Sequence, residues 1–274
     1  MIKDKQHYDL APLAGKTGRS FNINMPQMAM SGLSESWLFK ELGDLHWQMI
    51  ADGLQSPSNE LSDATGNRLY ATFTRISVSS DALMSYKENS PFDLEGDLFR
   101  FGSGVYFSEV KFTNGSAQIM SSFSMRGESG SNLYLLKGRP KIPPNCKIAN
   151  HRALPQFGQE YFTVRASSLP SDIFSREYEI VPQYDINGVG LLYFAAYPII
   201  SDICEDRFTS QRNLSTTKRD VFYFRNCDPS DTLVFRIHDL RSSDLLVKSD
   251  TSISRKSDGA LMARIFTTKV VTTG

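Results

Sequence analysis

The sequence predicts an α+β fold made of two similar halves, each a central helix followed by an antiparallel sheet. A loop of small residues runs into an apolar, aromatic-bearing helical segment twice, at 31–39 and at 187–194, and the two segments align without a gap. Strand-like runs follow each segment. In each half, two runs are joined by a dipeptide that favours tight hairpins, Asn114-Gly115 in the first and Asp258-Gly259 in the second.

The first half is expected to start with a short strand at 20–25 and to continue into a helix from Ser34. Gly43 is a poor helix former, so we expect the helix to end or kink there. Three strand-like runs follow, at 69–78, 105–112 and 117–123. Ahead of them all, residues 1 to about 20 have little periodicity and predict an extended arm.

The second half repeats this order after a proline-rich linker at 138–155. Short strands are expected at 160–165 and 174–181, and a helix from Leu191. Pro198 should end or kink that helix at the place that matches Gly43. Four further strand-like runs complete the chain, at 220–225, 232–238, 245–255 and 260–266.

A single apolar helix with an antiparallel sheet curled around it is the pattern of a hot-dog unit. Residues 191–197 carry no charge, which suits a helix that the sheet contacts on nearly all sides. The duplicated pattern predicts a double hot-dog fold, with an N-terminal unit at 1–148 and a C-terminal unit at 149–274. An ordinary α+β sandwich with an apolar central helix is the alternative.

Charge and cysteine usage restrict the function classes. Lys plus Arg and Asp plus Glu number 30 each, so no overall field recruits nucleic acid or an anionic membrane. The N-terminus has no apolar secretory region, and the longest apolar stretch, 188–200, is too short to span a bilayer. Three cysteines without a C-x-x-C pair favour a reducing compartment, so we expect a cytoplasmic protein. The four histidines lack metal-ligand spacing, and no metal site is expected.

The segment before the second helix carries the residues best suited to chemistry. Asp185 and Asn187 lie beside Gly188, Val189 and Gly190. Glycines at a helix N-terminus let free N–H groups approach a ligand, and such groups hold a developing oxyanion. Asp185 is a candidate general base and Asn187 a candidate catalytic amide. The alternative is that both residues only cap the helix.

The matching segment of the first half lacks the acid, because Ala29 occupies the position that Asp185 has in the second. Ser31, Gly32 and Ser34 are candidate substrate-binding residues there. Capping of the helix is again the alternative, and Glu35 would favour the helix dipole without any catalytic role. The two pseudo-equivalent sites are therefore expected to differ in chemistry.

Other candidate groups have a structural alternative. Asp44 and His46 are two residues apart and would not face each other on a helix, so a catalytic dyad is not expected. His46 is interpreted as a structural histidine and Trp47 as a core or lining residue. Tyr70 and Tyr106 lie in predicted strands, where a phenol could reach a pocket between the halves, although packing is the default for each.

Residues 25–47 and 184–194 together resemble a family of double-hot-dog proteins of polyketide biosynthesis, related to the acyltransferase/decarboxylase of the leinamycin pathway. The resemblance implies that methylmalonyl-type acyl groups are taken from coenzyme A, decarboxylated and passed to an acyl carrier protein. It also implies a tyrosine that receives the acyl group, for which Tyr70 is a positional choice. The 184–190 segment further resembles the active-site loop of hot-dog thioesterases, with Val189 near the place of their histidine.

The sequence therefore supports an acyl-thioester enzyme that moves a malonyl- or methylmalonyl-type group from coenzyme A to a carrier protein. No tightly bound cofactor is expected: the coenzyme A thioester is the substrate and the phosphopantetheine of the carrier is the acceptor. The alternatives are a hot-dog thioesterase or dehydratase, a non-catalytic module that binds a carrier protein, and a structural protein with degenerate sites. A homodimer is compatible with each of them.

Overall fold

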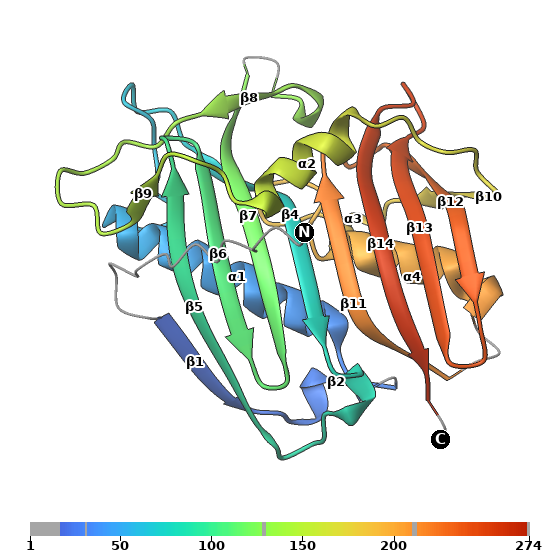
Figure 1. Ribbon diagram of the computed structural model, residues 1–274. Coiled ribbons are helices and arrows are strands. Elements are labelled where there is room, and N and C mark those ends of the chain that lie inside the picture. Colours follow the sequence, from blue (N-terminus) through green and yellow to red (C-terminus); the bar gives the residue numbers. More distant parts are fainter. Residues whose placement is uncertain (1–16, 31, 128–129, 210–212, 273–274) are drawn as a thin grey trace, which may run out of the picture.

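A single large antiparallel sheet dominates the computed structural model, which describes residues 17–30, 32–127, 130–209 and 213–272. Ten of its strands form a continuous path in the order β1-β5-β6-β7-β4-β11-β14-β13-β12-β10 (Figure 1). In chain order, those strands are β1 (Thr17–Asn22), β4 (Tyr70–Ser80), β5 (Pro91–Phe101), β6 (Val105–Phe112), β7 (Gly115–Arg126), β10 (Phe174–Glu179), β11 (Leu214–Tyr223), β12 (Thr232–Ser242), β13 (Leu246–Arg255) and β14 (Leu261–Val271).

The two halves of the chain meet at one pair of strands. β4 from the first half pairs with β11 from the second, from Lys218 opposite Ser79 to Phe222 opposite Arg75. Two short strands join from the side: β8 (Leu135–Gly138) pairs with β7, and β9 (Ala149–His151) runs parallel to β5. A separate small ribbon consists of β2 (Met28–Ala29) and β3 (Gly32–Leu33).

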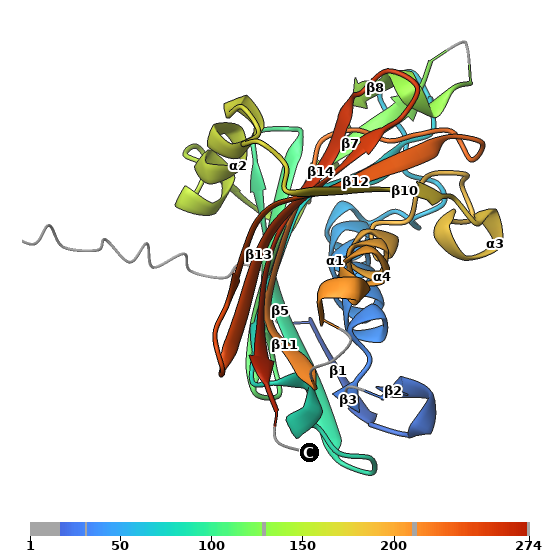
Figure 2. The same ribbon diagram turned by 90° about the vertical axis from the view of Figure 1, so that its right-hand side faces the viewer.

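Helices cover both faces of the sheet. The long helices α1 (Glu35–Leu54) and α4 (Ala196–Thr209) lie on one face, and α2 (Gln156–Ala166) lies on the other (Figures 1 and 2). The short helix α3 (Pro182–Asp185) and the 3-10 helices η1 (Met25–Gln27), η2 (Leu83–Ser85) and η3 (Asn132–Tyr134) occupy connections. The largest apolar core fills the space between the sheet and both long helices, so it is shared by the two halves.

α1 continues through Gly43 to Leu54, so the predicted end of the helix at Gly43 is wrong. A Cβ at this position would lie 2.2 Å from Cζ of Phe194, and the glycine therefore serves close packing. Because Phe194 belongs to the second half, Gly43 marks a contact between the halves. The cost of glycine within a helix is offset by that contact.

The second helix was predicted too early in the chain. α4 begins at Ala196, and Pro198 lies in its first turn rather than at a break. Proline is tolerated in the first turn because the N–H groups there have no partner within the helix. The residues predicted as the start of this helix, 191–195, lie outside α4. The N–H groups of Leu191 and Leu192 bond to the side chains of Asn187 and Asn226.

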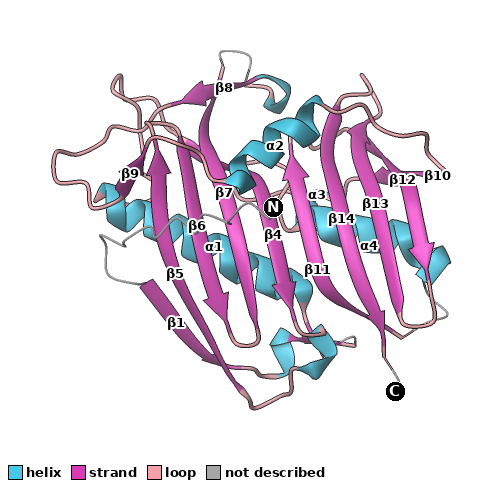
Figure 3. Cartoon of the chain, in the orientation of Figure 1, coloured by secondary structure: helices cyan, strands magenta, loops and turns pink. Residues whose placement is uncertain are grey.

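The predicted strand at 160–165 is also wrong, because these residues lie in α2 (Figure 3). Phe157 and Tyr161 of that helix pack on strand residues such as Phe107 and Phe222. The strand-like pattern reflected aromatic residues that bury one side of a helix. The other predicted strands are confirmed with shifted ends, the largest shift being at β11, which begins at Leu214. The strands β2, β3, β5, β8 and β9 were not predicted.

The two predicted hairpins are confirmed. Phe112 lies opposite Gly115, with Asn114 at a positive φ of 57°, and Gly259 has a φ of 68° in the turn between β13 and β14. The boundary between units 1–148 and 149–274 stays a prediction, since β9 pairs with a first-half strand. None of the described helices is long and apolar enough to cross a membrane. The three cysteines are free thiols.

Candidate active site

A cavity of about 860 Å³ lies where the two halves meet. We call it the seam cavity. Its walls come from α1, the start of β4, the end of β7 and the 132–137 segment in the first half, and from α2, the 187–194 segment and the end of β11 in the second. Aromatic and aliphatic side chains supply much of the lining, including Trp47, Phe73 and Phe194.

Basic residues outnumber acidic ones around the seam cavity. Five basic side chains and one acidic side chain are among its described lining residues: Lys40, Arg68, Lys137, Arg165, Arg225 and Asp44. Asp44 already pairs with Arg19, with Nη1 and Oδ2 2.6 Å apart. The cavity lining therefore carries an excess of basic side chains beside apolar ones, an arrangement that suits an anionic ligand with an apolar portion.

The backbone of the 187–193 loop forms one wall of this cavity, and its N–H groups can be accounted for one by one. The Asn187 side-chain oxygen accepts from the N–H groups of Val189 and Leu191, at 3.1 and 3.0 Å. The backbone N–H groups of Asn187, Gly190 and Tyr193 bond to carbonyls within 185–191, and that of Leu192 bonds to Asn226. Among the described residues, only the Gly188 N–H of this loop is left without an acceptor.

Gly188 also has room beside it. It lines the seam cavity, and a Cβ added there would meet nothing within 4 Å. The side-chain amide nitrogen of neighbouring Asn187 has no acceptor among the described residues, because only its oxygen is engaged. Two hydrogen-bond donors therefore lie side by side along the chain at the cavity wall, and such donors can hold a carbonyl oxygen.

Tyr70 lies in the seam cavity, at the start of β4. Two guanidinium groups approach its ring: Cζ of Arg68 is 5.3 Å and Cζ of Arg126 is 6.0 Å from the ring centroid. Tyr106, the other tyrosine considered, is fully buried in the core, and burial raises the pKa of its phenol. Of the two, Tyr70 alone reaches the cavity.

Asp185 does not face the seam cavity, as a general base would have to. It is buried and is absent from the cavity lining, and its Oδ2 accepts from the Tyr178 hydroxyl at 3.0 Å and the Val181 N–H at 2.8 Å. Burial and the Asp185 charge raise the pKa of Tyr178 to about 12, so the phenol keeps its proton. The carboxylate therefore anchors the turn that precedes the loop.

The candidate residues of the first half also have structural roles. Ser34 caps α1 by accepting from the Trp37 N–H. Gly32 has a φ of 106°, and a Cβ there would lie 2.2 Å from the Leu83 carbonyl oxygen. Neither residue lines the seam cavity, and Ser31 lies outside the described residues. Gly190, at a φ of 81°, turns the 187–193 loop beside Arg126.

An ion-pair network lies at the N-terminus of α1, where the pseudo-equivalent site was expected. Arg219 is 1% exposed at its side chain and donates to Glu35 at 2.7 Å and to Asp202 at 2.9 Å. Lys269 also pairs with Asp202, at 2.7 Å. Burial opposes ionisation of Asp202, but the charges of Arg219 and Lys269 outweigh it and lower its pKa to about 2. The two regions therefore differ, as the sequence predicted.

His46 is structural. It is fully buried, and its ring nitrogens bond to the hydroxyls of Ser108 and Ser121 at 2.6 and 2.7 Å. Burial lowers the pKa of His46 to about 3, so the ring is neutral at pH 7. Asp44 points to Arg19 instead, and no Asp44–His46 dyad forms. Trp47 lines the seam cavity.

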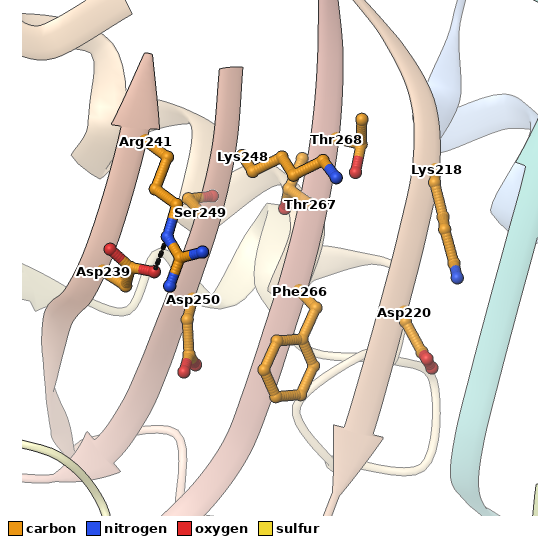
Figure 4. Close-up of a pocket in the computed structure, with 10 residues that line it drawn as sticks. All are labelled: Lys218, Asp220, Asp239, Arg241, Lys248, Ser249, Asp250, Phe266, Thr267 and Thr268. Atoms are coloured by element: carbon orange, nitrogen blue, oxygen red, sulfur yellow. Dashed lines mark hydrogen bonds and ion pairs between the residues drawn. The ribbon is translucent and has the colours of Figure 1, made fainter. Parts of the chain in front are cut away.

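A second hollow of about 400 Å³ lies over the strands of the second half, on the sheet face away from α4 (Figure 4). Its acidic residues are already paired: Asp239 with Arg241, Asp250 with Arg264, and Asp220 with Arg75. It has no histidine or cysteine in its lining. Across the described chain, no cluster of three potential metal ligands is present. The seam cavity is therefore the better candidate.

Sequence reasoning missed the side chains that hold the loop from outside, above all Asn132, Arg126 and Asn226. Asn132 donates to the Gly190 carbonyl, 58 residues away in sequence. Arg126 donates to the Val189 carbonyl, and Asn226 accepts from the Leu192 N–H. No local pattern marks these residues, because their role depends on contacts between distant segments.

Comparison with known proteins identifies the fold. Neither a family model nor a curated protein matches the sequence. Among solved structures, a protein assigned as an oleoyl thioesterase from Lactobacillus plantarum aligns with a TM-score of 0.70 at 10% identity, over 95% of this chain and 98% of the other. The chain has the fold of this thioesterase.

Two further structures support the same conclusion. A 12:0-ACP thioesterase from Umbellularia californica aligns with a TM-score of 0.65 at 11% identity, over 94% of both chains. An acyl-ACP thioesterase from Bacteroides thetaiotaomicron aligns with a TM-score of 0.62 at 13% identity, over 93% of this chain and 97% of the other. A hot-dog fold agrees with these likenesses, which concern the fold alone because the sequences have diverged so far.

Proposed function

We propose that this protein is an enzyme that cleaves acyl thioesters bound in the seam cavity. The observation that carries the proposal is the Gly188 N–H on the cavity wall beside the amide nitrogen of Asn187, since neither donor has an acceptor among the described residues. Attack on a thioester places negative charge on its carbonyl oxygen, and fixed N–H donors stabilise that charge. The similarity of the fold to thioesterases supports the same class of substrate.

The positive charge around the cavity supports a thioester that carries phosphate. Coenzyme A and the phosphopantetheine arm of a carrier protein both present phosphate at the end remote from the thioester. In our proposal the basic side chains, Arg68 and Arg225 among them, contact that phosphate, while the apolar lining contacts the acyl chain. The substrate is thus an acyl-coenzyme A or an acyl carrier protein.

Two acceptors for the acyl group are proposed. Water is the first, which makes the protein a hydrolase, as in the proteins that share its fold. The Tyr70 hydroxyl is the second: its oxygen bonds to the acyl carbon, the carbon–sulfur bond breaks, and the coenzyme A thiol leaves with the phenol proton. The carrier's thiol then attacks the acyl-tyrosine ester and releases the phenol, which makes the protein an acyltransferase. Tyr70 is favoured by its place in the cavity and by the two guanidinium groups near its ring, whose charge would stabilise negative charge that develops on the phenol.

The sequence resemblance suggests which acyl group and which acceptor the transferase would use. Two hot-dog units in one chain would transfer a malonyl- or methylmalonyl-type group to an acyl carrier protein, with decarboxylation. The structure contributes one argument toward it: the free carboxylate of such a group would be attracted by the excess of basic side chains around the cavity. A role in polyketide biosynthesis and a homodimeric assembly belong to this proposal.

Intact-mass measurement separates the candidates. The purified protein is incubated with malonyl-, methylmalonyl- and long-chain acyl-coenzyme A, with and without a carrier protein. Release of free coenzyme A without any mass gain on either protein indicates hydrolysis. A mass gain that disappears in Tyr70→Phe indicates the tyrosine route.

The oxyanion assignment has its own test. Replacing the residue-188 amide by an ester, with glycolic acid in place of Gly188, removes the N–H and keeps the backbone shape. We expect kcat to fall about 100-fold, as for other donors to an oxyanion. Gly188→Ala is the matched control, because it retains the N–H and has room for its Cβ. An unchanged kcat in the ester variant would overturn the assignment.

A further inference from the structure

Two residues of the first half donate hydrogen bonds to the second-half loop that bears the Gly188 N–H. Asn132, in η3, donates from its side-chain Nδ2 to the Gly190 carbonyl at 2.6 Å and to the Cys227 carbonyl at 3.1 Å. Arg126, at the end of β7, donates from Nη2 to the Val189 carbonyl. The two peptide carbonyls that follow Gly188 are thus both held from the other half of the molecule.

Asn132 is itself held firmly. Its backbone N–H donates to Oδ1 of Asp228 at 2.9 Å, and the hydroxyl of Ser131 donates to Oδ2 of the same carboxylate at 3.0 Å. Asp228 in turn donates its N–H to Asp231 at 2.9 Å. Asn132 is 3% exposed. Its side chain is therefore fixed in one orientation with respect to the second half.

The amide of Asn132 has only one chemically sensible orientation. Its nitrogen must face the Gly190 and Cys227 carbonyls, because an oxygen there would repel both. The side-chain oxygen is then buried without a partner among the described residues. Such an unpaired acceptor costs stability. The unpaired oxygen of Asn132 thus lowers stability, while its nitrogen makes two hydrogen bonds, to the Gly190 and Cys227 carbonyls.

We propose that Asn132 is a positioning residue for thioester cleavage. By holding the Gly190 carbonyl, it fixes the Gly188–Gly190 backbone so that the Gly188 N–H stays directed at the substrate oxygen. Arg126 supports the neighbouring carbonyl from the surface. This inference rests on the proposed function, because it assigns the residue through the oxygen-binding N–H. Small displacements of such a donor are expensive in rate, which is why an external clamp would be retained.

The test compares Asn132→Asp with the wild type on whichever acyl-coenzyme A the wild type turns over. The carboxylate has nearly the same size but cannot donate to the two carbonyls, and its charge repels them. We expect kcat to fall about 100-fold with KM changed by less than about threefold, since the lost interaction acts in the transition state. A role in stability alone would leave kcat per folded molecule unchanged, and that result would overturn the inference. Asn145→Asp is the control, because it makes the same side-chain change at an exposed position outside the cavity lining, where Asn145 donates to Gln55.

A second readout does not require turnover. A ketone analogue of acyl-coenzyme A, with CH₂ in place of the thioester sulfur and a ¹³C carbonyl, is bound to each protein and its carbonyl stretch is recorded. We expect a shift to lower frequency in the wild type that is lost in Asn132→Asp. Equal shifts in both proteins would refute the clamp and leave the proposed function standing. No binding or no shift in the wild type would refute the proposed function itself.

Arg126→Gln keeps the test decisive if Asn132→Asp does not fold. Arg126 is exposed, so its replacement should leave the global stability nearly unchanged. We expect a fall in kcat of about tenfold and a smaller loss of the carbonyl shift, because one of the two clamped carbonyls is released. Wild-type values for both measurements in this variant would contradict the inference.

Discussion

Gly43→Ala gives the sharpest test of how the two halves pack. In an ordinary helix interior the change stabilises by about 1 kcal/mol, because alanine is the better helix former. Here the new Cβ would lie 2.2 Å from Cζ, 2.8 Å from Cε2 and 3.0 Å from Cε1 of Phe194. Normal contact requires about 3.5 Å or more, so the ring or the helix must move by about 1 Å.

The ring has little freedom to move. Phe194 packs on Phe73 with centroids 4.3 Å apart and on Tyr193 with centroids 4.7 Å apart. Overpacking of a held side chain costs about 1 to 3 kcal/mol. The severe overlap places this case at the upper end, so after the helix gain we expect a net destabilisation of about 2 kcal/mol.

Urea unfolding followed by tryptophan fluorescence measures this change, since Trp37 and Trp47 both lie in α1. Gly158→Ala is the matched control: it is also a helical glycine, but its Cβ would come no closer than 3.2 Å to a neighbouring side chain. Gly43→Ala combined with Phe194→Leu should recover part of the loss. Stabilisation by Gly43→Ala alone would refute the assigned contact.

Two further outcomes follow from buried charges. Arg75→Met should lower the free energy of unfolding by about 3 to 5 kcal/mol, because it leaves the buried Asp220 carboxylate without the guanidinium that binds it at 3.0 and 2.8 Å. Partial recovery in the Arg75→Met, Asp220→Asn double variant would support this origin. A loss below about 1 kcal/mol in the single variant would contradict it. His46 should make stability fall as the pH falls below about 6.5: burial lowers the pKa of the folded ring to about 3, so between these values only the unfolded chain takes up the proton. From pH 6.5 to pH 5 this contributes a loss of about 2 kcal/mol, measured as the difference in urea unfolding between the wild type and His46→Gln, and equal pH slopes in the two proteins would count against it.

Much of the sheet could be predicted from local sequence. Alternating runs place β6 at 105–112, as observed, and Asn114-Gly115 defines the turn to β7 because it suits a left-handed backbone. The 187–190 segment was also recognisable as a place where backbone could approach a ligand, and Asn187 and Gly188 do line the seam cavity. These features depend on a few neighbouring residues, so the sequence alone is sufficient for them.

Contacts between distant segments decided the rest. From sequence, Gly43 suggests a helix break. In the structure it makes room for the ring of Phe194, which lies 151 positions later in the sequence. Asp185 suggests a general base until Tyr178 and Val181 are found to occupy its carboxylate. The sequence by itself predicted the helix and most of the strands of each half, and it predicted that the backbone at 187–190 could approach a ligand. Only the tertiary structure decided where the second helix begins, which residues face the cavity and which first-half side chains hold the loop, because packing and hydrogen bonding act through space and leave no periodic signal along the chain.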